Sequence, residues 1–300
     1  MDPRRRELLG ALAGLALMDA ASASQAMLVR AIPSSGEKLP VIGAGTWQSF
    51  DVGGDAAARA PLKEVLRVLF AGGGRVVDSS PMYGASESVV GDLCSELGIC
   101  EPLFLATKVW ARGREAGLRE MQRSIERMRA GRMDLMQVHN LLDVETHTKT
   151  LLDWKARTRV RYIGITHYTA SAHAQVERWL KTKQYDFVQI NYSLAEPESE
   201  RGILPLAREL GVAVMVNRPF ATGGMFRRTR GKPLPAWAAE LGIESWAQYF
   251  LKWIVAHPAV TCAIPATSKP AHMRDNAGAG VGAMPDEAMR RRMQQYYDAL

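Results

Sequence analysis

The feature that most constrains the fold of this chain is a repeated alternation of short apolar runs with stretches of helical periodicity. Such alternation is typical of parallel βα units. We count eight units, the number that closes a (β/α)8 TIM barrel of the α/β class. The first strand is entered through 41–43. Further strands are predicted at 76–78, 103–108, 135–139, 162–166, 187–191, 212–217 and 261–264, and helices at 57–71, 86–97, 114–128, 147–156, 171–181, 201–210, 245–256 and 270–278.

An N-terminal β-hairpin is predicted in front of the barrel, and a C-terminal helix behind it. Apolar runs at 27–33 and 39–43 flank a polar turn in which Gly36 supplies the positive φ. The last helix is expected at 285–297. Gly and Pro fall between the elements rather than in one run, so residues 27–300 are predicted to form a single domain.

Composition argues against several classes of protein. The chain has 300 residues, 47% of them apolar, and a net charge of +7, which fits an anionic cofactor and an ordinary basic surface equally well. No long basic stripe interleaved with aromatics occurs, so nucleic acid is not an expected partner. The cysteines Cys94, Cys100 and Cys262 contain no CxxC pair, and neither a metal site nor a disulfide scaffold is indicated. A bond between Cys94 and Cys100 after export is the less favoured alternative.

Residues 1–26 have the order of parts that characterises a secretory signal peptide. Arginines at 4–6 precede an apolar run at 10–18, and Ala21-Ser22-Ala23 offers a small-residue cleavage pattern. The arginines with Leu8 and Leu9 behind them resemble a twin-arginine signal, which predicts export of a folded protein to the periplasm. The apolar run is too short for a stable membrane span. The alternative is a poorly ordered N-terminal extension of a cytoplasmic protein.

Ionisable side chains stand where three successive predicted strands end. Asp78 follows Val76-Val77, Lys108 ends the next strand, and His139 ends the one after; Tyr83 lies five residues beyond Asp78. The active sites of TIM barrels lie at the carboxyl ends of the strands. We therefore expect these four side chains to meet at one mouth of the barrel.

In these four residues the chain resembles the aldo-keto reductases, and the resemblance runs from about Arg30 to Asn276. It implies NADPH-dependent reduction of an aldehyde or ketone to an alcohol, with Tyr83 as the proton donor. Lys108 would lower the pKa of Tyr83, and Asp78 would hold the Lys108 ammonium in place. His139 would orient the carbonyl of the substrate.

The same resemblance implies a set of cofactor-binding residues. Thr166, His167 and Gln189 match positions that bind the nicotinamide amide. Asn217 stands where the family often has an aromatic residue that stacks on the nicotinamide, so Phe220 is an alternative stacker. The remaining candidates are Arg218 beside the cofactor, Thr267, Ser268, Lys269 and Arg274 at the 2′-phosphate, and Asp275 and Asn276 at the adenine.

NADPH is expected to be preferred, although Ala266 and His272 replace residues that are usually basic, so NADH is possible. Trp47, Met82 and Trp110 are the expected walls of the substrate pocket. Because the chain ends at Leu300, it has none of the long C-terminal loop of larger family members, and an open, less selective pocket is predicted.

Two other functions fit the sequence less well. A nicotinamide-binding sensor or regulatory subunit with little turnover would retain the cofactor residues but would not need the four strand-end residues. A different barrel enzyme acting on a phosphorylated substrate would leave Tyr83 and His139 unexplained. The partner is expected to be a small carbonyl compound, and the protein is expected to be a monomer.

Overall fold

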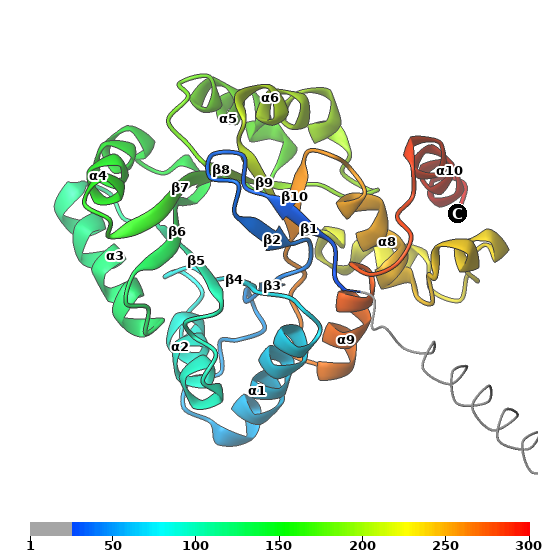
Figure 1. The fold of residues 1–300 in the computed structure, drawn as a ribbon, viewed down its shortest axis with the longest axis horizontal. Coiled ribbons are helices and arrows are strands. Elements are labelled where there is room, and N and C mark those ends of the chain that lie inside the picture. Colours follow the sequence, from blue (N-terminus) through cyan, green and yellow to red (C-terminus); the bar gives the residue numbers. More distant parts are fainter. Residues whose placement is uncertain (1–25) are drawn as a thin grey trace, which may run out of the picture.

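The computed structural model describes residues 26–300 and shows one eight-stranded parallel sheet curled into a barrel (Figure 1). The predicted TIM barrel, with its hairpin and its final helix, is confirmed. The predicted export signal lies almost entirely outside the described residues. The strands of the barrel, in the order in which they pair, are β3 (Ala44–Gly45), β4 (Val76–Asp78), β5 (Phe104–Val109), β6 (Met133–Val138), β7 (Val160–Thr166), β8 (Phe187–Asn191), β9 (Ala213–Asn217) and β10 (Val260–Ala263).

Backbone hydrogen bonds between the chain around β3 and the chain around β10 close the barrel. The amide of Gly43 donates to the carbonyl of Ala263 at 2.9 Å, and the amide of Ala263 donates to the carbonyl of Val41 at 2.8 Å. Gly43 has no room for a side chain, because a Cβ there would lie 2.8 Å from the Cβ of Val76. Glycine therefore fits at this position, where the chain entering β3 passes close to β4.

Helices surround the barrel at all the predicted positions (Figure 1). One short helix, α7, was not predicted; it begins at Gly224, the second of two consecutive glycines. Within residues 26–300 no helix is long and apolar enough to cross a membrane. The helices are α1 (Ala56–Ala71), α2 (Ser86–Leu97), α3 (Arg114–Arg127), α4 (Val144–Ala156), α5 (His173–Leu180), α6 (Ile203–Leu210), α7 (Gly224–Arg228), α8 (Trp246–Val255), α9 (Pro270–Gly278) and α10 (Glu287–Asp298).

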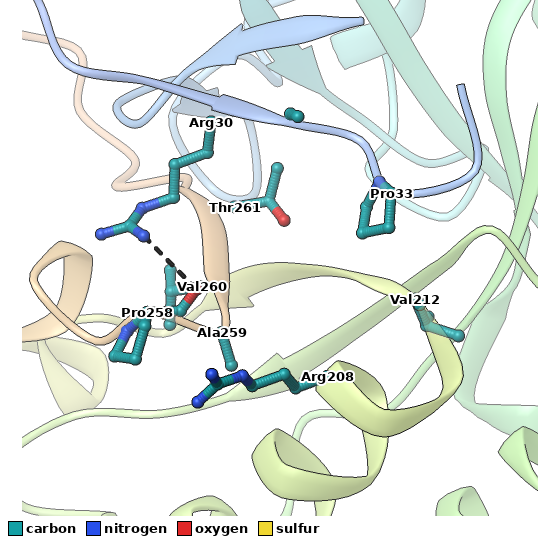
Figure 2. A pocket seen from close by; sticks show the side chains of 10 residues that line it. Arg30, Pro33, Arg208, Val212, Pro258, Ala259, Val260 and Thr261 are labelled. Atoms are coloured by element: carbon teal, nitrogen blue, oxygen red, sulfur yellow. Dashed lines mark hydrogen bonds between the residues drawn. The ribbon is translucent and has the colours of Figure 1, made fainter. Parts of the chain in front are cut away.

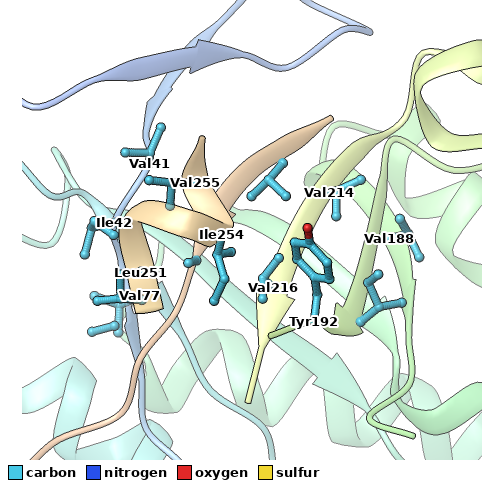
Figure 3. Packing of buried hydrophobic residues seen from close by; sticks show 14 of the residues in the cluster. Val41, Ile42, Val77, Val188, Tyr192, Val214, Val216, Leu251, Ile254 and Val255 are labelled. Atoms are coloured by element: carbon cyan, nitrogen blue, oxygen red, sulfur yellow. The ribbon is translucent and has the colours of Figure 1, made fainter. Parts of the chain in front are cut away.

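The apolar side chains form two cores, one on each face of the barrel wall. The larger core lies between the strands and the surrounding helices, and Figure 3 shows part of it, where Ile254 of α8 lies near Val216 of β9 and Leu251 lies near Val77 of β4. The smaller core fills the barrel interior and includes Phe104 and Phe187. Strands buried on both faces explain why the apolar runs in the sequence are continuous rather than alternating.

The hairpin of β1 (Val29–Ala31) and β2 (Lys38–Pro40) lies across the amino end of the barrel (Figure 1). Tyr162 of β7 donates from its hydroxyl to Glu37 in the hairpin turn at 2.6 Å. Beside the hairpin is a hollow of about 250 Å³, where Arg30 donates to the carbonyl of Pro258 (Figure 2). Arg30 also donates to the carbonyl of Val255 at 2.8 Å. This hollow is on the opposite side of the barrel from the strand-end residues.

A disulfide joins Cys94, near the end of α2, to Cys100 in the loop before β5. The expectation that these cysteines stay unpaired is therefore wrong. Gly98 takes the left-handed conformation, with φ 67°, and turns the chain back at the end of α2. This turn brings the two Cα atoms to 4.9 Å, within the range that a disulfide needs. Cys262 is free and buried.

Candidate active site

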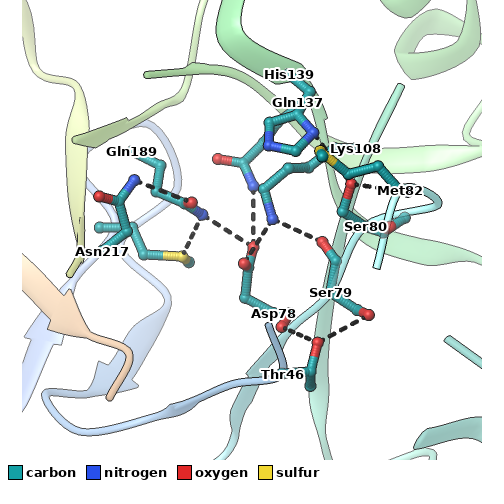
Figure 4. A network of polar contacts seen from close by, with 12 residues as sticks. Thr46, Asp78, Ser79, Ser80, Met82, Lys108, Gln137, His139, Gln189 and Asn217 are labelled. Carbon is teal, nitrogen blue, oxygen red and sulfur yellow. Dashed lines mark hydrogen bonds and ion pairs between the residues drawn. The ribbon is translucent and has the colours of Figure 1, made fainter. Parts of the chain in front are cut away.

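The ion pair between Asp78 and Lys108 is the most deeply buried part of the strand-end cluster. Asp78 is the last residue of β4, and Lys108 lies near the end of the neighbouring strand β5. The Lys108 Nζ lies 2.6 Å from the Asp78 Oδ2 and 2.6 Å from the carbonyl oxygen of Ser79 (Figure 4). Relative exposure is 0% for Lys108 and 2% for Asp78. The pair is therefore removed from water.

Tyr83 and His139 lie against this ion pair. The Lys108 Nζ is 5.1 Å from the centre of the Tyr83 ring. The rings of Tyr83 and His139 are 5.8 Å apart and meet nearly edge to face, at 81°. The structure thus brings together the four side chains that the sequence placed at one mouth of the barrel.

Burial controls the pKa values of the two proton-bearing rings. It raises the pKa of Tyr83 above its ordinary value of 10, and the Lys108 cation opposes this rise without cancelling it. Lys108 lowers the pKa of Tyr83, as expected, but burial has the larger effect, so the net direction is upward. The pKa of His139 falls to about 2, because burial and the Lys108 charge both disfavour the imidazolium. Tyr83 and His139 are therefore both neutral at ordinary pH.

Lys108 stays charged despite its burial. Burial alone lowers the pKa of Lys108, but the Asp78 carboxylate beside it, with a smaller contribution from Tyr83, raises that pKa above its ordinary value. A fixed cation therefore lies next to the phenol.

Three further polar side chains, which were not predicted from the sequence, hold the cluster. Gln137 donates to the Asp78 Oδ1 at 3.3 Å, and the Ser80 Oγ lies 3.1 Å from the His139 Nδ1. Thr46 donates to the carbonyl of Asp78 at 3.1 Å (Figure 4). For Gln137 the sequence did contain a signal. Side chains alternate along a strand, and Gln137 lies two residues before His139, so the two side chains face the same way.

The candidate nicotinamide residues form a connected polar chain across β8 and β9. Gln189 donates to the Asp78 Oδ1 at 2.9 Å, and Asn217 donates to the Gln189 Oε1 at 3.4 Å and to the His167 carbonyl at 3.1 Å. Thr166 is buried and pairs with Gln189 in the sheet. The Oδ1 of Asn217 is buried without a hydrogen-bond partner. Asn217 therefore has a polar, linking position rather than a stacking one.

Arg218 and Phe220 point into different surroundings. Arg218 forms an ion pair with Glu196 at 2.9 Å, its guanidinium lies 5.8 Å from the centre of the Tyr168 ring, and its backbone has a φ of 49°, rare for a non-glycine residue. Phe220 packs 4.8 Å from Phe226 of α7, ring centre to ring centre. The structure thus places Phe220 in an aromatic cluster.

The candidate residues after β10 are of two kinds. Ser268, Lys269 and Arg274 are exposed, and the Thr267 hydroxyl accepts a hydrogen bond from the amide of Lys269 at 3.1 Å. By contrast, Asn276 is buried. The Asp275 carboxylate accepts hydrogen bonds from Ser245 at 2.7 Å and Gln248 at 2.8 Å, so it also fixes the start of α8.

The three candidate substrate residues are large apolar side chains left open to solvent. Trp47, Met82 and Trp110 are 44%, 39% and 42% exposed. The Trp110 ring lies 6.2 Å from the His139 ring. Tyr168, 46% exposed and following β7, was not identified from the sequence. Exposed aromatic groups around a buried polar cluster are the usual composition of a small-molecule site.

Fold and site together define a TIM-barrel enzyme, with its ionisable groups gathered where barrel enzymes carry their chemistry. Within residues 26–300 no group of three or more His, Cys, Asp or Glu side chains is arranged to hold a metal ion. The family model described as "Aldo/keto reductase family" matches residues 41–294. The chain belongs to this family of oxidoreductases.

Two relatives share about a quarter of the aligned residues with this chain. The chain is 26% identical over 210 residues to aldo-keto reductase YhdN of Bacillus subtilis (strain 168), covering 64% of this chain and 62% of that protein, which is less than two thirds of its length. It is 27% identical over 237 residues to pyridoxine 4-dehydrogenase of Escherichia coli (strain K12), covering 72% of this chain and 79% of that protein.

Solved structures share the fold over most of the chain. An aldo/keto reductase from Klebsiella pneumoniae in complex with NADP and acetate superposes with a TM-score of 0.74 and 25% identity, covering 87% of this chain and 93% of that one. An aldo-keto reductase from the same organism in complex with NADPH superposes with a TM-score of 0.74 and 24% identity, covering 91% of this chain and 95% of that one.

Proposed function

We propose that this protein reduces an aldehyde or ketone to an alcohol, with hydride from NADPH and a proton from Tyr83. The observation that carries the proposal is the buried Asp78–Lys108 pair beside Tyr83 and His139, in a chain of the aldo/keto reductase family. A side chain cannot donate hydride, so the cofactor must supply it. The Klebsiella pneumoniae relative with NADP bound supports this choice of cofactor.

Tyr83 is suited to donate the proton. Its raised pKa keeps the phenol protonated at neutral pH. When the proton leaves, the Lys108 ammonium stabilises the phenolate that remains, and Asp78 keeps that ammonium fixed. The neutral His139 donates from its second ring nitrogen to the carbonyl oxygen when Ser80 donates to its Nδ1.

The residues present fit a nicotinamide cofactor. A carboxamide needs both a donor and an acceptor, and the buried, unpartnered Oδ1 of Asn217 supplies an acceptor beside Gln189. A 2′-phosphate needs cations, and Lys269 and Arg274 are exposed after β10. Asp275 contributes less directly, because its carboxylate already binds Ser245 and Gln248.

The test is oxidation of NADPH by the purified protein against a panel of aldehydes and ketones. Turnover is expected with several substrates, because Trp47, Met82 and Trp110 leave the mouth open. Tyr83→Phe is expected to lose turnover and to keep NADPH affinity. Binding of NADPH without turnover of any substrate would favour the sensor or regulatory subunit instead. Arg274→Ala is expected to weaken the binding of NADPH but not the binding of NADH.

We also propose export to the periplasm as a monomer. The disulfide between Cys94 and Cys100 supports export, since such bonds persist in oxidising compartments and are rare in the cytosol. Cell fractionation with an antibody tests the location, and a full-length product confined to the cytosol would contradict it. Sedimentation equilibrium tests the oligomeric state.

A further inference from the structure

The loop of residues 110–113, here called the Trp110 loop, is held by side chains from the two helices beside it. The Glu120 carboxylate of α3 accepts a hydrogen bond from the backbone amide of Trp110. The Asp143 carboxylate, at the start of α4, accepts a hydrogen bond from the backbone amide of Gly113 at 2.7 Å. The His147 Nε2 of α4 lies 2.6 Å from the carbonyl oxygen of Ala111. An exposed loop is thus attached to the protein at three backbone positions.

His147 is the buried member of this set, and the proposed chemistry does not use it. Its side chain is 0% exposed. Because a carbonyl oxygen only accepts, the Nε2 of His147 must carry the proton and donate to Ala111. The Nδ1 is buried without a hydrogen-bond partner, so the bond to the carbonyl of Ala111 is the one hydrogen bond that the ring makes in the described part of the chain.

The adjacent helix makes room for this ring. A Cβ at Gly117 of α3 would lie 2.4 Å from the His147 Cε1 and 2.8 Å from its Nδ1. Any larger residue would push the ring away from its present place. Gly117 thus lets α3 pack directly against the Cε1 and Nδ1 of the His147 ring.

The loop in turn determines where the Trp110 indole lies. That indole is 42% exposed and 6.2 Å from the ring of His139. An exposed indole on a free loop would sample several rotamers, and ordering it on binding would cost affinity. Fixing the backbone on both sides of Trp110 removes part of that cost before a substrate arrives.

We infer that His147 is a positioning residue that fixes Trp110 as a wall of the substrate pocket. The inference rests on the proposed carbonyl reductase function. The substrates that depend on His147 are aldehydes or ketones with a flat apolar group, such as an aromatic ring, which lies on the indole. A small aldehyde reaches Tyr83 and His139 without contacting Trp110, and so is independent of His147.

The test compares His147→Leu with His147→Gln in the full chain, using benzaldehyde and propanal with NADPH. Leu fills the space but cannot donate, whereas the Gln amide can replace the Nε2 donor. For His147→Leu we expect KM for benzaldehyde to rise about fivefold to tenfold, the effect of one lost hydrogen bond. The kcat, KM for propanal and the Kd for NADPH are expected to stay within about twofold. In His147→Gln most of this rise in KM for benzaldehyde should be absent.

Thr148→Val is the matched control, because it removes a buried hydrogen bond from the same helix, to the Tyr185 hydroxyl at 2.7 Å, without touching the loop. If Thr148→Val raises KM for benzaldehyde as much as His147→Leu does, the effect is general destabilisation, and the inference is overturned. If His147→Leu does not fold, Asp143→Gly is the second variant. It removes the carboxylate that holds the amide of Gly113, and glycine readily adopts the φ of 48° found at position 143. It should then raise KM for benzaldehyde alone.

Hydrogen exchange separates this inference from the proposed function. In His147→Leu the amides of Trp110 and Gly113 should exchange at least tenfold faster than in the unmodified protein, whether or not any substrate turns over. A protein that reduces no carbonyl but shows this exchange pattern would refute only the proposed function and the substrate role. Unchanged exchange together with unchanged KM would refute the positioning role while leaving carbonyl reduction intact.

Discussion

The Lys108 Nζ lies 2.6 Å from the Asp78 Oδ2, and neither side chain has appreciable contact with solvent. Removing one member of such a pair leaves an unpaired buried charge and typically costs about 3–5 kcal/mol. Asp78→Asn is therefore expected to lower the free energy of unfolding by about that amount. Urea unfolding, followed by circular dichroism, measures it.

Asp78→Asn with Lys108→Met is the control for this prediction. The double variant removes both charges, so its loss of stability should be smaller than that of Asp78→Asn alone. A double variant that loses the sum of both single effects would show that the charges do not stabilise each other.

The pH dependence of reduction follows from the two neutral rings. Tyr83 must be protonated to act, and its pKa is raised above 10, so kcat for reduction should be flat through neutrality and fall only at strongly alkaline pH. His139, with a pKa of about 2, should add no step near pH 6.5. The reverse reaction needs the phenolate, and its rate should rise as pH increases. A pH series of kcat in both directions measures this, and a midpoint near pH 7 for reduction would contradict it.

Asn217 should affect cofactor affinity through Gln189. Asn217→Leu keeps the size of the side chain but removes the hydrogen bonds to the Gln189 Oε1 and the His167 carbonyl. Because the variant also removes the unpartnered Oδ1 acceptor and leaves the Gln189 Oε1 without the Asn217 donor, the Kd for NADPH is expected to rise about tenfold. Fluorescence titration measures it. Met215→Leu removes only a weak sulfur contact to Gln189 and should change the Kd by less than about twofold. Equal Kd values for all three proteins would refute the linking role of Asn217.

Much of this fold can be predicted from the sequence because each barrel strand is an apolar run that ends in polar residues. Asp78, Lys108 and His139 stand out because an ionisable group directly follows or ends such a run. Gln137 and Ser80 do not stand out, since their importance depends on side chains from neighbouring strands that lie far away in the sequence.

The sign of the net pKa shift of Tyr83 was also beyond sequence reasoning. The presence of Lys108 nearby could be inferred, but the degree of burial could not, and burial has the larger effect. Cys94 and Cys100 pair because Gly98 reverses the chain between them, a detail of turn geometry that spacing alone does not reveal.

The disulfide between Cys94 and Cys100 should stabilise the fold without affecting catalysis. It closes a loop with a sequence separation of only 6 residues, and chain-entropy arguments give such a short loop about 2 kcal/mol. It lies between the end of α2 and the start of β5, at the end of the barrel opposite Tyr83. Cys100→Ser should therefore unfold at lower temperature or urea concentration and should keep the kcat and KM of the unmodified protein.

The control for this prediction is the unmodified protein before and after reduction of the disulfide. Cys262→Ser is not a suitable control, because Cys262 is buried inside the barrel. Reduction should lower stability in the unmodified protein and leave Cys100→Ser unchanged. A loss of activity on reduction would instead link this end of the barrel to the active site.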